Sequence, residues 1–424
     1  MPNQTTKMPG DIEVHIDFAG GLKRVGTLHR LPRRGGGEAV SFEYHSDWLS
    51  EGARFSLEPA LMLGRGAFAP ANGQQIFGSI GDSAPDTWGR RLMQRAERRR
   101  AEREGRPIRT LMETDYLLGV SDISRLGALR FRLRGKNAFQ SPVEAGVPGL
   151  VELGPLLQVT ERILRDEETD EDFQIIFAPG SSLGGARPKA SVIDQHDQLT
   201  IAKFPKENDD YSIEIWESVA LVLARRAGIN ASTHSLLRVV DKPVLLSRRF
   251  DRRDGTRVPF LSALSMSGLR DGERGSYPEL VDVITQNGAH TTRDARELYR
   301  RMAFNVLTSN VDDHLRNHGF LWEGRSGWSL SPAYDLNPTP VDVRPRVLTM
   351  NITLDEATCD LDLVCEAAEY FGLSPAAARG IVKEVAAATQ TWSEVAAAAG
   401  ARPSEIRRME SAFMHNDLER ALAL

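Results

Sequence analysis

A lysine on the apolar face of a predicted strand constrains the fold of this chain more than any other feature. The stretch QLTIAKFP, residues 198–205, alternates as a half-buried strand does and places Lys203 on the same face as Leu199 and Ile201. Because an unpaired ammonium group is costly to bury, this lysine needs an anionic partner inside the folded protein. Snorkelling of its side chain to the surface is the alternative.

The next predicted element offers that partner. YSIEIWESVALVLARRAGIN, residues 211–230, is typical of a helix closed by Gly228. Glu217 is the single charged member of a stripe that otherwise holds Ile213, Ala220, Leu221 and Ala224. We therefore expect an ion pair between Lys203 and Glu217. Protein kinases use such a pair to position nucleotide phosphates, and a purely structural salt bridge would have the same pattern.

A second polar cluster follows a predicted helix at residues 291–310, which Thr291 or Thr292 can cap. In NVDDHLRN, Asp312 and Asn317 fit the D-x-x-x-x-N spacing of a kinase catalytic loop, where Asp orients the acceptor hydroxyl and Asn binds a metal ion. We interpret His314 in this loop as a structural residue rather than a zinc ligand.

A third carboxylate comes after the next predicted strand. SGWSLSPAYDLNP, residues 326–338, supplies a short strand and then Asp335. A carboxylate here suits a second Mg²⁺ ligand, because Mg²⁺ prefers hard oxygen donors and keeps several waters. A capping Asp in a proline-rich turn is the structural alternative.

A glycine-rich loop precedes the strand lysine. In APGSSLGGARPKAS, residues 178–191, Gly180, Gly184 and Gly185 leave the backbone free to approach an anion, and Lys189 adds charge. The loop matches neither the Walker A nor the Rossmann pattern, so a surface loop is the alternative. The order of these five features is that of a bilobal kinase, and it predicts ATP and Mg²⁺ as cofactors.

The rest of the chain frames these motifs. Residues 12–63 are strand-rich, and residues 82–105 predict an arginine-dense helix with Asp82 or Ser83 near its start. This face is either solvated or a nucleic-acid or partner surface. We expect an α+β, kinase-like bilobal fold with three parts: a strand-rich N-terminal subdomain (1–150), a nucleotide-binding small lobe (151–250) and a mostly helical large lobe (251–424). The Ala-rich segments at 375–400 predict packing helices of that lobe rather than a helix-turn-helix.

Composition adds the setting. The 424 residues carry a net charge of −5, which by itself gives no reason to expect nucleic acid. Two cysteines, Cys359 and Cys365, form no disulfide framework, and the start of the chain has no secretory pattern. No apolar run is long enough to cross a bilayer. We therefore expect a cytoplasmic protein with no membrane partner.

Taken together, the stretches SSLGGARPK, IAKFP, WESVALVLARRAGIN, LLSRRFDR, NVDDHLRNHGF and SPAYDLNP resemble the HipA-type serine/threonine kinases of bacterial toxin–antitoxin modules. GTLHR, FEYHSDWL and DSAPDTWGRR are similar to the amino-terminal subdomain of that family, so the resemblance covers nearly the whole chain.

The resemblance implies a role for individual residues. Asp312 would be the catalytic aspartate, Asn317 and Asp335 the Mg²⁺ ligands, and Lys203, with Glu217 as its partner, the ATP-phosphate lysine. Further ATP contacts would come from Gly184, Gly185, Ala186, Arg248, Phe250 and His314. Ser182 lies where the family places an autophosphorylated serine, with Ser181 as the alternative. A phosphate there would add about −1.5 to −2 charge beside the nucleotide, which should eject the loop and switch the kinase off.

The resemblance also implies partners. Family members commonly pair with a helix-turn-helix, HipB-like antitoxin that binds operator DNA, and inhibit growth by phosphorylating a translation protein such as an aminoacyl-tRNA synthetase. Two other functions are considered: a small-molecule hydroxyl kinase, which uses the same Asp-to-Asn loop, and a non-catalytic subunit of a repressor complex. The presence of every expected catalytic residue type argues against the latter.

Overall fold

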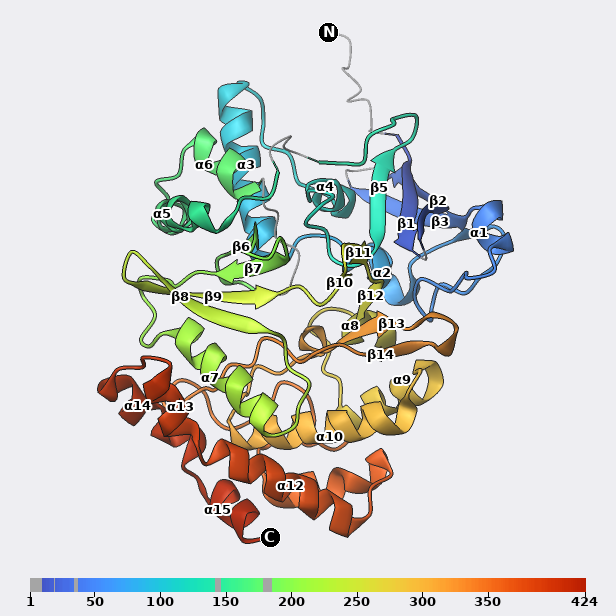
Figure 1. Ribbon diagram of the computed structural model, residues 1–424. Coiled ribbons are helices and arrows are strands. Elements are labelled where there is room, and N and C mark those ends of the chain that lie inside the picture. The colour runs from blue at the N-terminus through green and yellow to red at the C-terminus, as the bar shows by residue number, and fades with distance from the viewer. Residues whose placement is uncertain (1–9, 19, 34–36, 142–145, 178–184) are drawn as a thin grey trace. The chain divides into compact units, whose positions relative to one another are not determined.

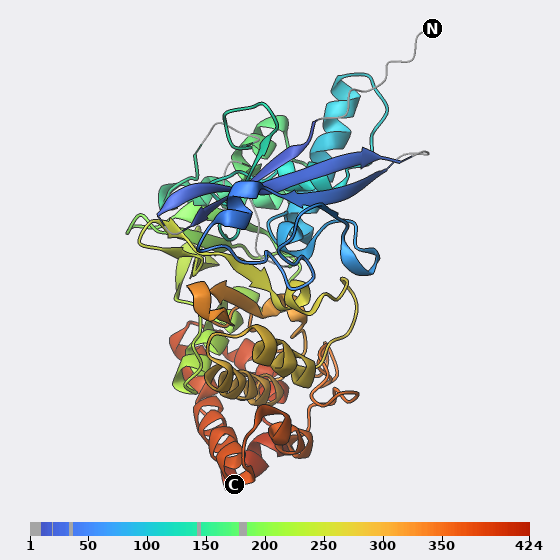
Figure 2. The same ribbon diagram turned by 90° about the vertical axis from the view of Figure 1, so that its right-hand side faces the viewer.

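Strong alternation at the start of the chain builds an antiparallel sheet. In β1 (Ile12–Phe18) the side chains of Ile12, Val14 and Ile16 are fully buried, as the period of two requires. The pairing of β1 with β2 (Gly21–Pro32) shifts register between Val14 and His15, which marks a β-bulge. Figure 2 shows β1 to β3 in blue, lying side by side. The other strands are β3 (Glu38–Tyr44), β4 (Ala67–Phe68) and β5 (Leu129–Leu133). The order across the sheet is β4-β3-β2-β1-β5.

The computed structural model describes residues 10–18, 20–33, 37–141, 146–177 and 185–424. The chain divides into two compact units that interleave in sequence. The first comprises Met1–Pro148, Glu168–Ala186 and Asp251–Leu261, and the second Gly149–Glu167, Arg187–Phe250 and Ser262–Leu424. The expected three-part division at residues 150 and 250 stays a prediction.

The arginine-dense helix of the first unit begins later than expected. It is α3 (Thr87–Arg103), and its cap is Asp86, whose side chain accepts a hydrogen bond of 2.8 Å from the Gly89 backbone N–H. Asp82 and Ser83 instead follow the short α2 (Gly78–Gly81), so the expected start of the helix was wrong. Several of its arginines pair within the unit: Arg90 with Glu113, Arg95 and Arg99 with Glu168, and Arg103 with Asp170. These pairs account for much of the arginine density as intramolecular contacts.

The first unit is completed by short elements. They are α1 (Ser46–Ser50), η1 (Ala71–Gly73), α4 (Glu113–Leu118), α6 (Asp170–Phe177), β10 (Arg252–Arg253) and β11 (Thr256–Arg257). The strand β12 (Phe260–Ser262) follows.

A four-stranded antiparallel sheet positions the lysine in the second unit (Figure 1). Its order is β6 (Lys189–Ile193), β7 (Leu199–Lys203), β9 (Lys242–Arg248) and β8 (His234–Val239). The helix α7 (Ile213–Arg226) packs on β8 and β9, and Ser212 caps its start. Gly228 takes a φ of +77° just after this helix, which favours glycine and confirms the expected stop. Helix α5 (Leu153–Leu164) packs on β8.

The long helix α10 (Thr291–Leu307) lies at the centre of the mostly helical part of the second unit. Leu298, Met302 and Val306, at helical spacing, are fully buried and form its apolar face. The predicted cap is wrong: Thr291 is already the first helical residue, and His290 stands before it without a side-chain capping bond.

Helix α12 (Pro375–Thr389) packs along α10, in agreement with Figure 1, where the two helices lie side by side. The Ala-rich segments are therefore packing helices, as predicted. The other elements of this part are η2 (Leu150–Glu152), α8 (Ala263–Ser267), α9 (Tyr277–Asn287), η3 (Leu315–Asn317), β13 (Gly319–Trp322), η4 (Gly324–Ser326), β14 (Trp328–Leu330), α11 (Leu361–Glu366), η5 (Ala367–Phe371), α13 (Trp392–Ala398), α14 (Pro403–Phe413) and α15 (Asn416–Ala423). None of the helices in the described ranges is long and apolar enough to cross a bilayer.

Candidate phosphoryl-transfer site

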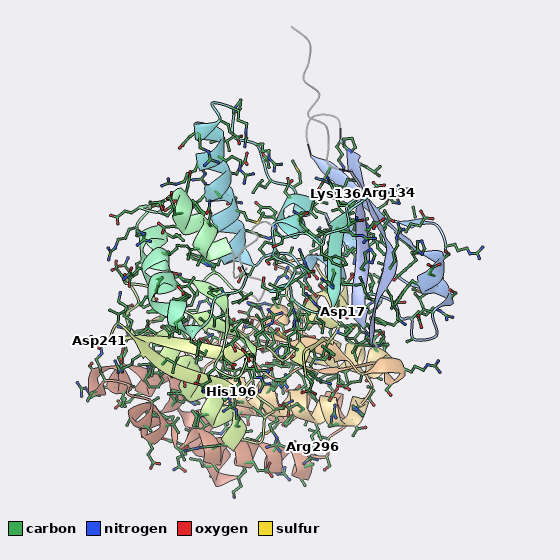
Figure 3. All side chains as sticks on the ribbon, turned by 45° about the horizontal axis from the view of Figure 1, so that its top comes forward. Asp17, Arg134, Lys136, His196, Asp241 and Arg296 are labelled. Atoms are coloured by element: carbon green, nitrogen blue, oxygen red, sulfur yellow. The ribbon has the colours of Figure 1, made fainter. Side chains whose placement is uncertain are left out.

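Lys203 lies between two carboxylates that come from distant parts of the second unit. Its Nζ donates hydrogen bonds of 2.6 and 2.8 Å to the two carboxylate oxygens of Glu217 and one of 2.8 Å to Oδ1 of Asp335. Lys203 is the last residue of β7. The opposite end of this strand follows the β6–β7 turn, which carries the exposed His196 labelled in Figure 3. The ion pair expected from the sequence is thus present, and Asp335 joins it.

Burial and charge oppose each other in this cluster. Burial by itself would raise the pKa of the Asp335 carboxyl, but the ammonium groups of Lys203 and Lys189 outweigh it and hold this pKa well below its usual range. Burial disfavours the charged form of Lys203, yet Asp335 and Glu217 raise its pKa above the ordinary value. Burial raises the pKa of Glu217, and the charge of Asp335 adds to the rise. A charged lysine and a charged Asp335 are therefore the stable forms at neutral pH.

Asp335 is held in a backbone conformation that few non-glycine residues adopt. Its φ is +58°, and such strain persists where surrounding contacts determine it. One contact is the Asn337 side-chain amide, which donates to Asp335 Oδ1 at 3.2 Å. Asn337 is fixed in turn, because its backbone N–H donates to Asn310 Oδ1 at 3.0 Å. The side chain of Asp335 thus points at a lysine and an amide, unlike that of an Asp that caps its own turn.

The predicted catalytic loop leaves the end of α10 and enters the one-turn helix η3. Asp312 is exposed, and its Oδ1 accepts a hydrogen bond of 2.7 Å from Arg344. Asn317 is buried and donates through Nδ2 to the Asp312 carbonyl at 3.2 Å. Its Oδ1 is buried with no hydrogen-bond partner among the described residues. A buried amide oxygen of this kind is costly unless a ligand completes it, and a hard cation would do so.

The neighbouring Asp313 has a structural role that the sequence did not reveal. This carboxylate is buried and accepts a hydrogen bond of 2.5 Å from the Tyr277 hydroxyl, while His318 Nε2 lies 3.1 Å from the same oxygen. Burial alone would raise the pKa of Asp313, but His318 and Tyr277 lower it below its usual value. His318 therefore braces the loop through its side chain, and the half-buried His314 stands at the N-terminal end of η3.

Two further buried charged residues lie near the lysine: Lys189, which the sequence assigned to the glycine-rich loop, and Glu214, which was not predicted. Lys189 is buried, with an exposed fraction of 4%, and lies directly opposite Lys203 in the β6–β7 register. Two like charges facing each other across a sheet are unfavourable unless anions lie between them. Glu214, on the first turn of α7, is also buried and pairs with Arg187 at 3.0 Å. The predicted stripe of α7 omitted Glu214, because its position falls beside that stripe.

The remaining predicted nucleotide contacts are only partly placed. Ser181, Ser182 and Gly184 lie outside the described residues, while Gly185 and Ala186 belong to the first unit. Arg248 ends β9 and donates to the side-chain oxygen of Gln198 at 2.9 Å. The ring of Phe250 contacts the ring of Tyr334, and their centroids are 5.4 Å apart. Tyr334 directly precedes Asp335 in the sequence. The roles of these residues in nucleotide binding stay predictions.

Two curated proteins share short stretches of sequence with this chain. One is a "Putative kinase" of Haemophilus influenzae, which is 34% identical over 79 residues. The match covers 19% of this chain and 22% of that protein. Another stretch of 99 residues is 33% identical to 24% of "Putative kinase Y4dM" of Sinorhizobium fredii. The chain thus matches about a quarter of the length of these curated relatives.

The fold has a counterpart among solved structures. HipA from the Shewanella oneidensis complex of HipA, HipB and operator DNA superposes with a TM-score of 0.65 over 97% of this chain and 96% of its own, at 17% identity. This likeness confirms the α+β, kinase-like fold. Residues 181–392, half of the chain, match the family model of the HipA-like C-terminal domain. The chain therefore belongs to the HipA-like family.

Proposed function

We propose that this protein is an ATP- and Mg²⁺-dependent kinase that phosphorylates serine or threonine hydroxyls of a protein and acts as a growth-inhibiting toxin. The observation that carries the proposal is the placement of Lys203 between Glu217 and Asp335. A lysine on a strand, a glutamate on the next helix and a carboxylate after the catalytic loop form the constellation that phosphoryl transfer needs.

Each residue of the constellation has a role in this proposal. Lys203 binds the phosphates of ATP, and Glu217 keeps its ammonium group charged and in place. Lys189, on the same face of the sheet, supplies a second cation for the nucleotide phosphates. The Oδ1 of Asn317, which has no hydrogen-bond partner in the described part of the chain, and the carboxylate of Asp335 fit Mg²⁺, since two protein oxygens suffice when phosphates and waters complete the octahedron. Mg²⁺ bound there would neutralise charge on the transferring phosphoryl group.

Asp312 is the proposed base that activates the acceptor hydroxyl. Its exposed carboxylate accepts the proton of the acceptor hydroxyl while the hydroxyl oxygen bonds to the γ-phosphorus. The bond from that phosphorus to the bridging oxygen breaks, and ADP leaves with the electron pair. The lysines hold the phosphate oxygens during this exchange, which is electrostatic stabilisation at the place where charge develops.

The test is transfer of labelled phosphate from ATP by purified protein, first to a protein extract and then to a panel of small hydroxyl compounds. Wild type should label protein bands, and Asp312→Ala and Asp335→Ala should label none while keeping a cooperative unfolding transition. Full activity in either variant would refute the assignment. Labelling of small compounds alone would favour the small-molecule kinase instead.

The partners follow from the same proposal. The solved neighbour is a complex of HipA with HipB and operator DNA, which supports a helix-turn-helix antitoxin and, through it, operator DNA as partners of this chain. The proposed target is a translation protein such as an aminoacyl-tRNA synthetase. Phosphoproteomics after expression of wild type and Asp312→Ala in the native host tests both the target and growth inhibition.

The proposal includes autophosphorylation in the phosphate loop. Ser182, or its neighbour Ser181, is the proposed acceptor, and a phosphate there would repel the nucleotide phosphates. Ser182→Ala should then raise steady-state activity. Mass spectrometry that finds no phosphate on either serine after incubation with ATP would refute this part alone.

A further inference from the structure

Residues 340–347, PVDVRPRV, form a segment in which charged and apolar side chains alternate. Each charged side chain has a partner: Asp342 pairs with Arg408 at 3.0 Å, Arg344 with Asp312 at 2.7 Å, and Arg346 with Asp417 at 2.6 Å. The valines are part-exposed, with 49% of Val341, 46% of Val343 and 40% of Val347 open to solvent, and the side chains of Asp342 and Arg344 are exposed as well. The segment thus presents both apolar and charged side chains beside the catalytic loop.

The two arginines of this segment differ in how firmly they are held. Arg346 is half-buried and donates to the Ser309 hydroxyl, to the Val306 carbonyl and to Asp417. The side chain of Arg344 is 54% exposed, and its one hydrogen bond among the described residues is to Asp312. Arg346 therefore anchors the segment, whereas Arg344 can exchange partners, because an exposed ion pair contributes little free energy.

The partner of Arg344 is the carboxylate that must receive the acceptor hydroxyl. In the pair, the guanidinium occupies one oxygen of Asp312, with 57% of that aspartate's side chain exposed. An acceptor hydroxyl that takes the place of Arg344 on Oδ1 of Asp312 frees this guanidinium, which then needs another anion. A carboxylate beside the acceptor hydroxyl supplies that anion at the right place.

We propose that Arg344 is a specificity-determining residue that selects acceptor segments carrying an acidic residue next to the phosphorylated hydroxyl. The occupant of this surface is an extended protein segment, whose apolar side chains contact Val341 and Val343 and whose carboxylate takes Arg344 from Asp312. The inference rests on the proposed kinase function and names the class of its substrate.

Binding and transfer are measured separately on fluorescent peptides that hold one serine and, within two residues of it, Asp, Asn or Lys. We expect wild type to bind the Asp peptides at least about fivefold more tightly than the Asn peptides, because an arginine–carboxylate contact is charge-assisted. Arg344→Ala should remove this preference, and Arg344→Glu should reverse it in favour of Lys peptides. Asp312→Asn, although inactive, should bind Asp peptides more tightly than wild type, since it releases Arg344.

Arg420→Glu is the matched control, because Arg420 forms an exposed pair with Asp362 on the surface of the same unit. It should keep the wild-type preference for Asp peptides. Equal binding of Asp and Asn peptides by wild type, or an unchanged preference in Arg344→Glu, would overturn the proposal. A charge preference in binding without phosphate transfer would support this surface while refuting the kinase function.

Discussion

The hydroxyl of Tyr277 donates a hydrogen bond of 2.5 Å to the carboxylate of Asp313, and both side chains are buried. Tyr277 opens α9, so this bond ties that helix to the loop that carries Asp312. The chain of bonds continues: Asn305 donates to the Tyr277 hydroxyl, Asn310 donates to Asn305, and the Asn337 backbone donates to Asn310. The catalytic loop and the segment of Asp335 are therefore fixed through one buried polar network.

The first prediction concerns the Tyr277–Asp313 bond. Tyr277→Phe removes a donor to a buried carboxylate, so we expect the free energy of unfolding in urea to fall by about 1.5–3 kcal/mol. Tyr299→Phe is the control, since the buried Tyr299 hydroxyl donates to the neutral Val364 carbonyl at 3.0 Å. It should cost about 0.5–1.5 kcal/mol. Equal losses in the two variants would show that the charge of Asp313 contributes nothing to the stability of the loop.

The second prediction tests the lysine as a shared cation. Lys203→Met removes the cation that Glu217 and Asp335 share, and breaking such a pair costs about 3–5 kcal/mol. Adding Glu217→Gln should restore part of the stability, because one of the two carboxylates is then neutral. Phosphate transfer should stay about 10²–10³-fold below wild type in both variants.

The control for this prediction is Lys242→Met, which removes a partly exposed lysine paired with Glu161. It should change the free energy of unfolding by less than about 1 kcal/mol. If the double variant is no more stable than Lys203→Met alone, the two carboxylates do not compete for one cation in the folded protein.

The ion pair of Lys203 and Glu217 could be predicted because it depends on local periodicity. One residue ends a strand and the other lies on the inner face of the next helix, so alternation and helical spacing place both charges inside. Asp335 lies 132 residues further along the chain, and only the tertiary fold brings it to Lys203. The order of the motifs predicted that Asp335 belongs to the same site, but no local pattern predicted its contact with Lys203.

Asp312 and Asp313 show where sequence reasoning ends. The two are adjacent and chemically identical, and the D-x-x-x-x-N spacing selects the first of them. Nothing local indicates that the second is buried against Tyr277, because that contact depends on how α9 packs on the loop. The predicted cap of α3 was wrong for a related reason. Asp82, Ser83 and Asp86 are all residue types that cap helices well, and residue type alone does not show that Asp86 is the cap.

The third prediction is a pH dependence of stability in the first unit. Burial, with a contribution from Asp82, raises the pKa of Glu58 to about 7, and its carboxylate accepts a hydrogen bond of 2.6 Å from the Ser79 backbone. The unfolded chain has a pKa of about 4.3 for this group and therefore releases the proton first. Stability from Glu58 is greatest below that value and is lost as the pH rises towards 7.

Glu58→Gln removes this titration and keeps an acceptor oxygen for Ser79. The variant should gain about 2 kcal/mol relative to wild type between pH 5 and pH 8. Urea unfolding of both proteins at the two pH values measures the gain. A difference between wild type and variant that is the same at pH 5 and pH 8 would show that Glu58 is not protonated in the folded protein.

The last prediction separates the roles of Asn317 and Asn337. Both have a buried Oδ1 without a hydrogen-bond partner among the described residues, and Asn337 in addition uses its side-chain amide to hold Asp335 at 3.2 Å. If Asn317 binds Mg²⁺ directly, Asn317→Ala should raise the Mg²⁺ concentration for half-maximal phosphate transfer by more than about tenfold. Asn317→Asp, which keeps an oxygen able to coordinate the metal, should recover most of the metal affinity. Asn337→Ala should instead lower the maximal rate, because a freer Asp335 is misplaced more often. Titration of Mg²⁺ at saturating ATP distinguishes the two effects, and a Mg²⁺ requirement that Asn317→Ala leaves unchanged would remove Asn317 from the metal site.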